Sequence, residues 1–110
     1  MQKLIAWKGR ANANKITLSN KGKTLTADEI GNISKIEIKY NDIYYSSSIY
    51  PGAFDMSTEA DSGAILIKPG LLPIPAGNDM AELVVYDAGN QEGIVWLQFI
   101  FVMRDDAYVE

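Results

Sequence analysis

Alternation of apolar and polar residues at every second position is the pattern that most restricts how this chain can fold. It is clearest in residues 33–40, where Ile36 and Ile38 fall on one side of an extended backbone and Lys35 and Glu37 fall on the other. A side-chain period of two is that of a β-strand with one buried and one solvated face, which is typical of antiparallel sheets. The segment is therefore predicted to be a strand.

Similar patterns, separated by Gly, Pro, Asn and Asp turns, predict strands over much of the chain. No stretch of twelve residues follows the 3.6-residue helical period, so helix is limited to short turns, for which residues 26–30 and 57–60 are the candidates. The other predicted strands are residues 15–19, 22–26, 64–68, 81–86 and 93–103, the last two joined by a loop over residues 87–92.

About seven to nine short strands in 110 residues are the pattern of an all-β, antiparallel β-sandwich, of which the immunoglobulin-like fold is one form. A small β-barrel is the alternative. The length suits a single hydrophobic core, so residues 1–110 are predicted to form one domain.

The absence of both cysteine and histidine limits the chemistry available to this chain. Without cysteine there are no disulfides, thiolate zinc sites or cysteine nucleophiles. Without histidine, the commonest general base and the commonest transition-metal ligand are missing. We therefore expect a protein that is not an enzyme and has no cofactor and no metal site.

Three local patterns match functional motifs only in part. Residues 22–24, Gly-Lys-Thr, lack the glycine that a phosphate-binding loop requires five residues earlier, where Thr17 stands. Residues 87–93 offer Gly and Gln where a calcium loop needs oxygen ligands, so a polar hairpin loop is predicted. A paired-carboxylate site of the glycosidase type would have to be built from loop acids whose spacing does not require it, namely Asp42, Asp55, Glu59 and Asp61.

Charge is unevenly distributed along the chain. Residues 1–50 hold eight Lys/Arg and four Asp/Glu, a balance of +4, whereas residues 51–110 hold two and ten, a balance of −8; together they give −4. The basic residues mostly alternate with apolar ones, and the net acidity opposes attraction to phosphate, so no nucleic-acid partner is expected. An uneven charge distribution of this kind is a hint of head-to-tail assembly.

No apolar run is long enough to cross a bilayer as a helix, and the four-residue apolar run near the N-terminus is too short for a signal-peptide core. No membrane partner is expected, and the chain is predicted to be cytoplasmic at synthesis.

The last predicted strand departs from simple alternation because both of its faces are apolar apart from Gln98. One interpretation is a central strand that is buried on both faces. The other is that the face with Trp96, Gln98 and Ile100 is covered by another protein subunit, since monomers rarely expose a large apolar patch. On the second interpretation these three residues bind a protein partner, either another copy of the chain or a larger assembly.

A Tyr/Ser-rich segment over residues 44–52 is the second candidate binding surface. Tyrosine supplies contact area at low entropic cost, and serine hydroxyls supply hydrogen bonds, as in adaptable binding sites. The functional interpretation is a carbohydrate- or protein-recognition surface, and the structural one is an edge strand whose tyrosines alternate between core and solvent. The residues concerned are Tyr44, Tyr45, Tyr50 and Phe54.

The order of segments over residues 26–103 resembles that of small proteins from tailed bacteriophages and prophages. Residues 26–38 resemble an Asp-containing turn leading into a Thr/Ser-basic-apolar strand, and residues 63–70 resemble a strand with a closing glycine. Residues 81–87, followed by Gly-Ile-Val-Trp at 93–96, resemble a closing hairpin. In place of the family's glycine-rich aromatic turn, this chain has Leu-Leu-Pro-Ile-Pro-Ala-Gly-Asn at 71–78.

The resemblance implies a β-sandwich module of the virion, at the tail, neck or baseplate, that acts by self-association or by docking onto a larger assembly. It implies no catalytic residues. It also implies that the protein, after its synthesis in the cytoplasm, becomes part of the virion. Because one fold serves many functions, this function is an expectation by analogy.

Overall fold

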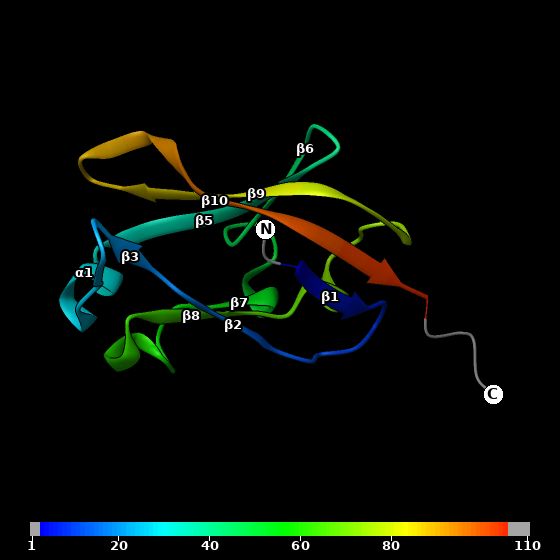
Figure 1. Cartoon of the computed structure of the whole chain (residues 1–110), viewed down its shortest axis with the longest axis horizontal. Helices are drawn as coiled ribbons and strands as arrows, with labels where there is room; N and C mark the ends of the chain where they lie inside the picture. The colour runs from blue at the N-terminus through cyan, green and yellow to red at the C-terminus, as the bar shows by residue number, and fades with distance from the viewer. Residues whose placement is uncertain (1–2, 106–110) are drawn as a thin grey trace.

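Strand pairing establishes the all-β fold over residues 3–105, the part of the chain that the computed structural model describes. A five-stranded sheet in the order β1-β10-β9-β5-β6 packs on a three-stranded sheet in the order β2-β8-β7, and β3 and β4 form a small hairpin (Figure 1). The strands are β1 (Lys3–Trp7), β2 (Asn14–Thr17), β3 (Ser19–Asn20), β4 (Lys23–Thr24), β5 (Ile33–Tyr40), β6 (Ile43–Ser46), β7 (Phe54–Asp55), β8 (Ala64–Ile67), β9 (Gly77–Asp87) and β10 (Asn90–Arg104).

Two open sheets in separate layers agree with the predicted sandwich, and the barrel alternative is wrong because no sheet closes on itself within the described residues. The ten strands over residues 3–105 exceed the expected seven to nine because β3, β4 and β7 are only two residues long. The immunoglobulin-like arrangement stays a prediction.

One strand pair is parallel, contrary to the antiparallel expectation. β1 runs beside β10 in the same direction, with Leu4 opposite Phe101 and Ala6 opposite Met103. The alternating burial of β1 places Leu4 and Ala6 in the core, and this pairing lets a strand from the start of the chain complete the five-stranded sheet.

Tight turns fix the two long hairpins. Asn41 and Asp42, both at positive φ (53° and 64°), make the two-residue connection between β5 and β6 that suits the twist of a hairpin. β9 and β10 are joined more tightly than the predicted loop over residues 87–92, because Asp87 already pairs with Asn90. The Asp87 carboxylate accepts hydrogen bonds from the Gly89 N–H and the Asn90 side chain, which confirms a polar hairpin turn at this position.

Helix is confined to short turns. α1 (Ala27–Gly31) begins at Thr26, whose hydroxyl accepts from the Glu29 N–H while the Glu29 carboxylate accepts from the Thr26 N–H. This reciprocal capping box explains why the predicted turn at residues 26–30 forms a helix. The predicted turn at 57–60 is displaced to the 3₁₀ turn η2 (Ala60–Ser62), and two more 3₁₀ turns begin at prolines: η1 (Pro51–Ala53) and η3 (Pro69–Leu71).

The core lies between the two sheets. Ring contacts join β5 to β10, where Tyr40 meets Phe101 edge-on at 5.4 Å, and Phe99 packs on Phe101 at 6.4 Å. The three-stranded sheet contributes fully buried aliphatic residues on β2 and β8, among them Ile16, Ile65 and Ile67.

Strands from the basic and the acidic halves of the chain lie side by side in both sheets. Lys15 on β2, for example, forms a 3.2 Å ion pair with Glu59. Basic and acidic residues that are separated along the sequence therefore lie near one another in the folded molecule. Among residues 3–105, no helix is long and apolar enough to cross a membrane.

Candidate interaction surface

The five-stranded sheet has one face toward the three-stranded sheet and one face turned away from it, here called the outer face (Figure 1). Alternation along β10 places Phe99, Phe101 and Met103 in the core, so Ile100 and Val102 lie on the outer face. Both are half-buried, not buried. The interpretation of this strand as buried on both faces within one chain is therefore wrong.

Four apolar side chains meet on the outer face across β1, β10 and β9, and we call them the apolar patch. Ile5 lies opposite Val102, and Ile100 lies opposite Met80. Ile5 and Met80 keep 39% and 43% of their surface exposed. Directly paired residues on one face of a sheet are close enough for their side chains to touch, so the patch is continuous.

A polar border adjoins the apolar patch on the side of β5. The side-chain amide of Gln98 donates a 2.9 Å hydrogen bond to Glu82, and Glu82 lies opposite Lys39. Together with Met80 and the β5–β6 turn, these residues line a shallow depression of about 310 Å³. The apolar patch thus has a rim of charged and hydrogen-bonding groups, which is the usual arrangement of protein interfaces.

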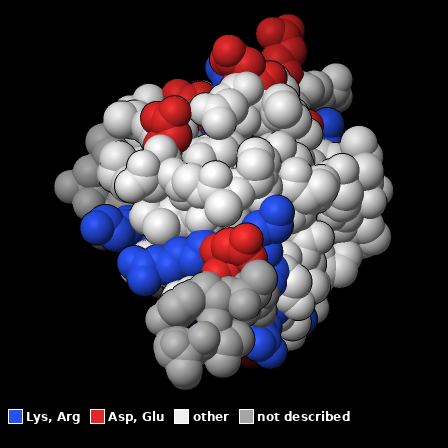
Figure 2. Space-filling model, turned by 90° about the vertical axis from the view of Figure 1, so that its right-hand side faces the viewer, with Lys and Arg blue, Asp and Glu red and all other residues white. Residues whose placement is uncertain are grey.

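At the other border, Arg104 lies 5.4 Å from the ring of Trp7, its partner in the parallel register. The end of the molecule where β1 and β10 finish carries both signs of charge: Figure 2 shows acidic side chains at its upper edge and mainly basic ones lower down, with broad uncharged surface between them. Charges of both signs therefore lie near the patch.

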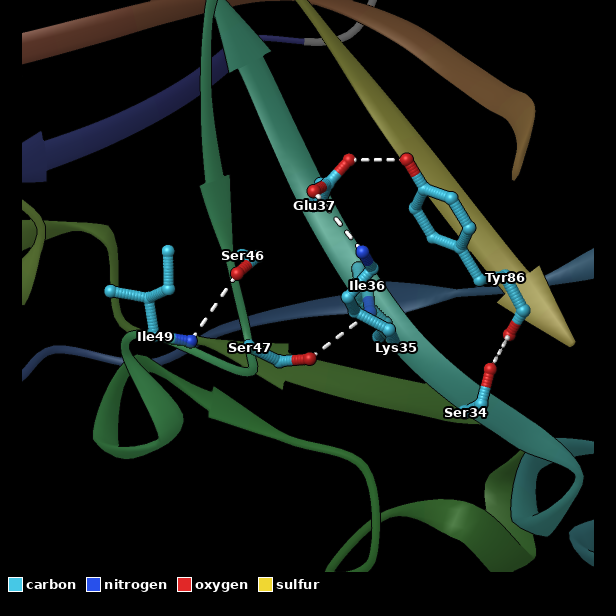
Figure 3. A network of polar contacts seen from close by, with 8 residues as sticks. All are labelled: Ser34, Lys35, Ile36, Glu37, Ser46, Ser47, Ile49 and Tyr86. Atoms are coloured by element: carbon cyan, nitrogen blue, oxygen red, sulfur yellow. Dashed lines mark hydrogen bonds and ion pairs between the residues drawn. The ribbon is translucent and has the colours of Figure 1, made fainter. Parts of the chain in front are cut away.

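Farther along the outer face, Glu37 on β5 is buried to 8% exposure, although it is a carboxylate. Its partners come from two strands: the hydroxyl of Tyr86 on β9 donates to it, and Lys35 lies 3.6 Å from it (Figure 3). Lys35 also sits 4.2 Å from the centre of the Tyr86 ring. A buried carboxylate is tolerated when it is paired and hydrogen-bonded in this way.

The hydrogen bond to Glu37, together with burial, raises the pKa of Tyr86 to about 12. Serines on and after β6 complete the network at its other side. The Ser47 hydroxyl accepts from the Ile36 N–H, and the Ser46 hydroxyl accepts from the Ile49 N–H (Figure 3). The contacts in this part of the outer face join β5 to β9 and to the segment that follows β6.

Trp96 does not share the outer face with Gln98 and Ile100, contrary to the prediction. A β-bulge interrupts the ladder, since Val95 and Leu97 pair with the adjacent residues Val84 and Leu83 and leave Trp96 between them unpaired. The extra residue shifts the alternation by one position. Trp96 is half-buried and packs against the core, whereas Gln98 and Ile100 lie together as predicted.

The Tyr/Ser segment does not assemble an aromatic surface. Tyr45 and Phe54 are buried in the core, and Tyr50 packs against it with its ring 6.3 Å from that of Tyr45. Burial also raises the pKa of the Tyr45 hydroxyl. Only Tyr44 among the four is exposed, at 50%, with Lys39 5.6 Å from its ring. Within the edge strand β6, Tyr44 and Tyr45 point to solvent and to the core respectively, as the structural interpretation expected.

Two of the four loop acids considered for catalysis, Asp55 and Glu59, are engaged in local contacts. Asp55 accepts hydrogen bonds from the backbone and hydroxyl groups of Ser57 and Thr58, which hold its pKa well below its ordinary value. Glu59 pairs with Lys15 and accepts from Ser62. Over residues 3–105, no group of three or more acidic side chains is arranged to hold a metal ion.

The sequence reasoning missed Ile5 and Met80, the two most exposed members of the apolar patch. Met80 lies before the predicted start of its strand at residue 81, and the strand at residues 3–7 was not predicted. A signal was present at residues 3–7, where an apolar run of four residues, Leu-Ile-Ala-Trp, has the length of a buried strand. No protein-family model matches the chain, and no match was found among curated proteins.

Proposed function

We propose that this protein is a non-enzymatic structural module that self-associates through the outer face of its five-stranded sheet. The observation that carries the proposal is the apolar patch of Ile5, Met80, Ile100 and Val102, which is continuous across three strands and open to solvent. Removal of such a patch from water is the main driving force for association.

A second copy of the chain is the occupant that the charges favour. The outer face carries Lys39 and Arg104 as well as Glu82 around the same patch. A surface with both signs of charge around an apolar centre can be complementary to itself, as a two-fold interface requires. A patch rimmed by one sign would instead favour a partner of opposite charge.

The particle in which this module acts follows from the resemblance described above. We propose a role in the virion of a tailed bacteriophage or prophage, at the tail, neck or baseplate, where repeated copies of small β-domains assemble. Genes for capsid or tail proteins beside the gene for this chain would support this location, and a neighbourhood without any would count against it.

Sedimentation velocity over a range of concentrations tests self-association. The Ile5→Glu variant places a charge in the apolar patch, and Ile49→Glu is the matched control because Ile49 is an exposed isoleucine (68%) in the turn after β6, away from the patch. We expect wild type and Ile49→Glu to form the same oligomer and Ile5→Glu to remain monomeric. A monomeric wild type at high concentration, or equal loss of association in both variants, would overturn the proposal.

A further inference from the structure

A cavity of about 300 Å³ opens at the α1 end of the molecule, away from the end where β1 and β10 finish. Residues from three segments line it: the β3–β4 hairpin, the helix α1 with the residues after it, and the junction of β9 with β10. Figure 1 shows these segments at the same end of the molecule. The aliphatic residues that line the cavity are Leu25, Ile33, Val85 and Ile94. The volume is at the lower end of the ~300–1,000 Å³ typical of small-molecule sites, so the cavity suits one small chemical unit.

Trp96 lines this cavity at the point where β10 bulges. In regular alternation after Val95, the chain would pair Trp96 with Leu83, but Leu97 takes that place. Bulges re-aim side chains and are frequent next to functional sites. The indole offers a broad apolar surface and one N–H donor at the cavity wall.

The polar wall has several atoms that are not used within the protein. Within residues 3–105, the side-chain amides of Asn20 and Asn32 form no hydrogen bond, and both residues are exposed. Glu29 uses one carboxylate oxygen to cap α1, and Asp87 uses one in the β9–β10 turn, so one oxygen of each is unused. Asn90 donates to Asp87, which leaves its side-chain carbonyl free. The wall therefore combines two amide donors with an excess of acceptors.

We propose that this cavity binds a single neutral sugar residue, free or at the end of a glycan. A sugar has an apolar ring face for the indole and hydroxyl groups that both donate to acceptors and accept from amides. Anionic ligands are disfavoured because two carboxylates, Glu29 and Asp87, line the cavity. Lys21 and Lys23 line a separate, neighbouring depression. An ammonium group would leave the amide donors of Asn20 and Asn32 unmatched, since it has no acceptor.

This site is separate from the apolar patch in both position and chemistry. The cavity opens at the α1 end of the molecule. The patch lies toward the other end, on β1, the first part of β9 and the last part of β10. An experiment can therefore refute sugar binding without refuting self-association, and the reverse.

Nuclear magnetic resonance titration with D-glucose, D-galactose and N-acetyl-D-glucosamine tests the proposal. The chain has two tryptophans, so a Trp7→Phe variant assigns the indole signal of Trp96 and also serves as the matched control. We expect saturable shifts with at least one sugar at the Trp96 indole and the Asn20 and Asn32 side chains. Trp96→Ala should weaken this binding by about tenfold or more, as loss of an aromatic anchor does, and Trp7→Phe should retain it.

A double variant, Asn20→Ala with Asn32→Ala, guards against a folding defect in Trp96→Ala because both asparagines are exposed. It should weaken sugar binding while leaving the backbone spectrum folded. The proposal is overturned if none of the three sugars gives saturable shifts, if the shifts lie away from the cavity, or if both variants bind as wild type does. Binding of putrescine at Trp96 without binding of any sugar would assign the cavity to ammonium ligands and would also overturn it.

Discussion

The hydroxyl of Tyr86 on β9 donates a hydrogen bond to the carboxylate of Glu37 on β5, and this contact fixes two adjacent strands across the outer face. Glu37 is buried, and Lys35 is close to both the Glu37 carboxylate and the Tyr86 ring. Because the donor is uncharged and the acceptor is a carboxylate, loss of the Tyr86 proton would place two negative charges together. The pKa of Tyr86 follows from this geometry.

Tyr86 should be among the last of the described tyrosines to ionise. Its pKa is raised to about 12, above the ordinary value of 10.0. The protonated hydroxyl of Tyr86 therefore contributes fully to the free energy of unfolding below pH 10, and this contribution is lost as the pH rises toward 12. Ultraviolet absorbance of tyrosinate, compared between wild type and Tyr86→Phe, should show one high-pH ionisation missing in the variant. If Tyr86→Phe loses an ionisation near pH 10 instead, the hydrogen bond to Glu37 is not formed in solution.

The same substitution should lower the free energy of unfolding at pH 7 by about 1.5–3 kcal/mol, the range for hydrogen bonds to charged groups. The loss is expected because Glu37 would stay buried with Lys35 as its remaining partner. Urea denaturation measures it. Tyr44→Phe is the control, since the Tyr44 hydroxyl is on an exposed ring; equal losses in the two variants would contradict the account.

Gly93 cannot be replaced without strain. It has a φ of 89°, and a Cβ at this position would lie 2.8 Å from the Tyr86 ring and from Val84. We expect Gly93→Ala to destabilise the fold by about 1–3 kcal/mol through both backbone conformation and crowding. Gly89→Ala in the same hairpin is the control, because its Cβ would meet only Asp87 at an ordinary 3.6 Å. Thermal unfolding should separate the two, and similar melting temperatures would refute this reading.

Asp55 should stabilise the loop after β7 as a carboxylate. Its pKa is lowered by hydrogen bonds from Thr58 and Ser57, so its contribution is present above about pH 4, the unfolded-state pKa, and falls as the pH drops below that value. Asp55→Ala should cost about 1 kcal/mol at pH 7, as loss of a capping side chain does. Unfolding at pH 7 and at pH 3 should show this difference shrinking in acid.

Asp61→Ala is the matched control, since Asp61 is an exposed acid in the neighbouring turn η2. It should have little effect at either pH. A cost for Asp55→Ala that is the same at pH 3 as at pH 7 would show that the carboxylate charge is not responsible.

The strictly alternating strand β5 and the short apolar strand β8 were predictable from the sequence, and both lie where expected. Alternation assigns neighbouring residues to opposite faces but does not say which face is buried. For that reason Tyr45 could not be assigned to the core before its cross-strand neighbour Ile38 was known. The parallel pairing of β1 with β10 joins the two ends of the chain, and no local pattern encodes it.

The misplacement of Trp96 has a more specific cause. One unpaired residue in β10 reverses the face of every residue on its far side. Gly93 lies two residues before Val95, but residues 94–98 carry no Gly, Pro or Asn to mark the bulge itself. Gln98 and Ile100 were placed correctly relative to one another because they lie on the same side of the bulge. The pairing within the apolar patch could not be predicted, since it depends on the register of three strands.

Spin labelling of single-cysteine variants tests the central claim, self-association through the outer face, most directly. The chain has no native cysteine, so Met80→Cys on the apolar patch and Thr17→Cys on the exposed side of β2 each carry one label. The account predicts strong dipolar coupling between labels of two copies for Met80→Cys and weak or no coupling for Thr17→Cys. Coupling that is absent from Met80→Cys, or stronger for Thr17→Cys, would contradict it.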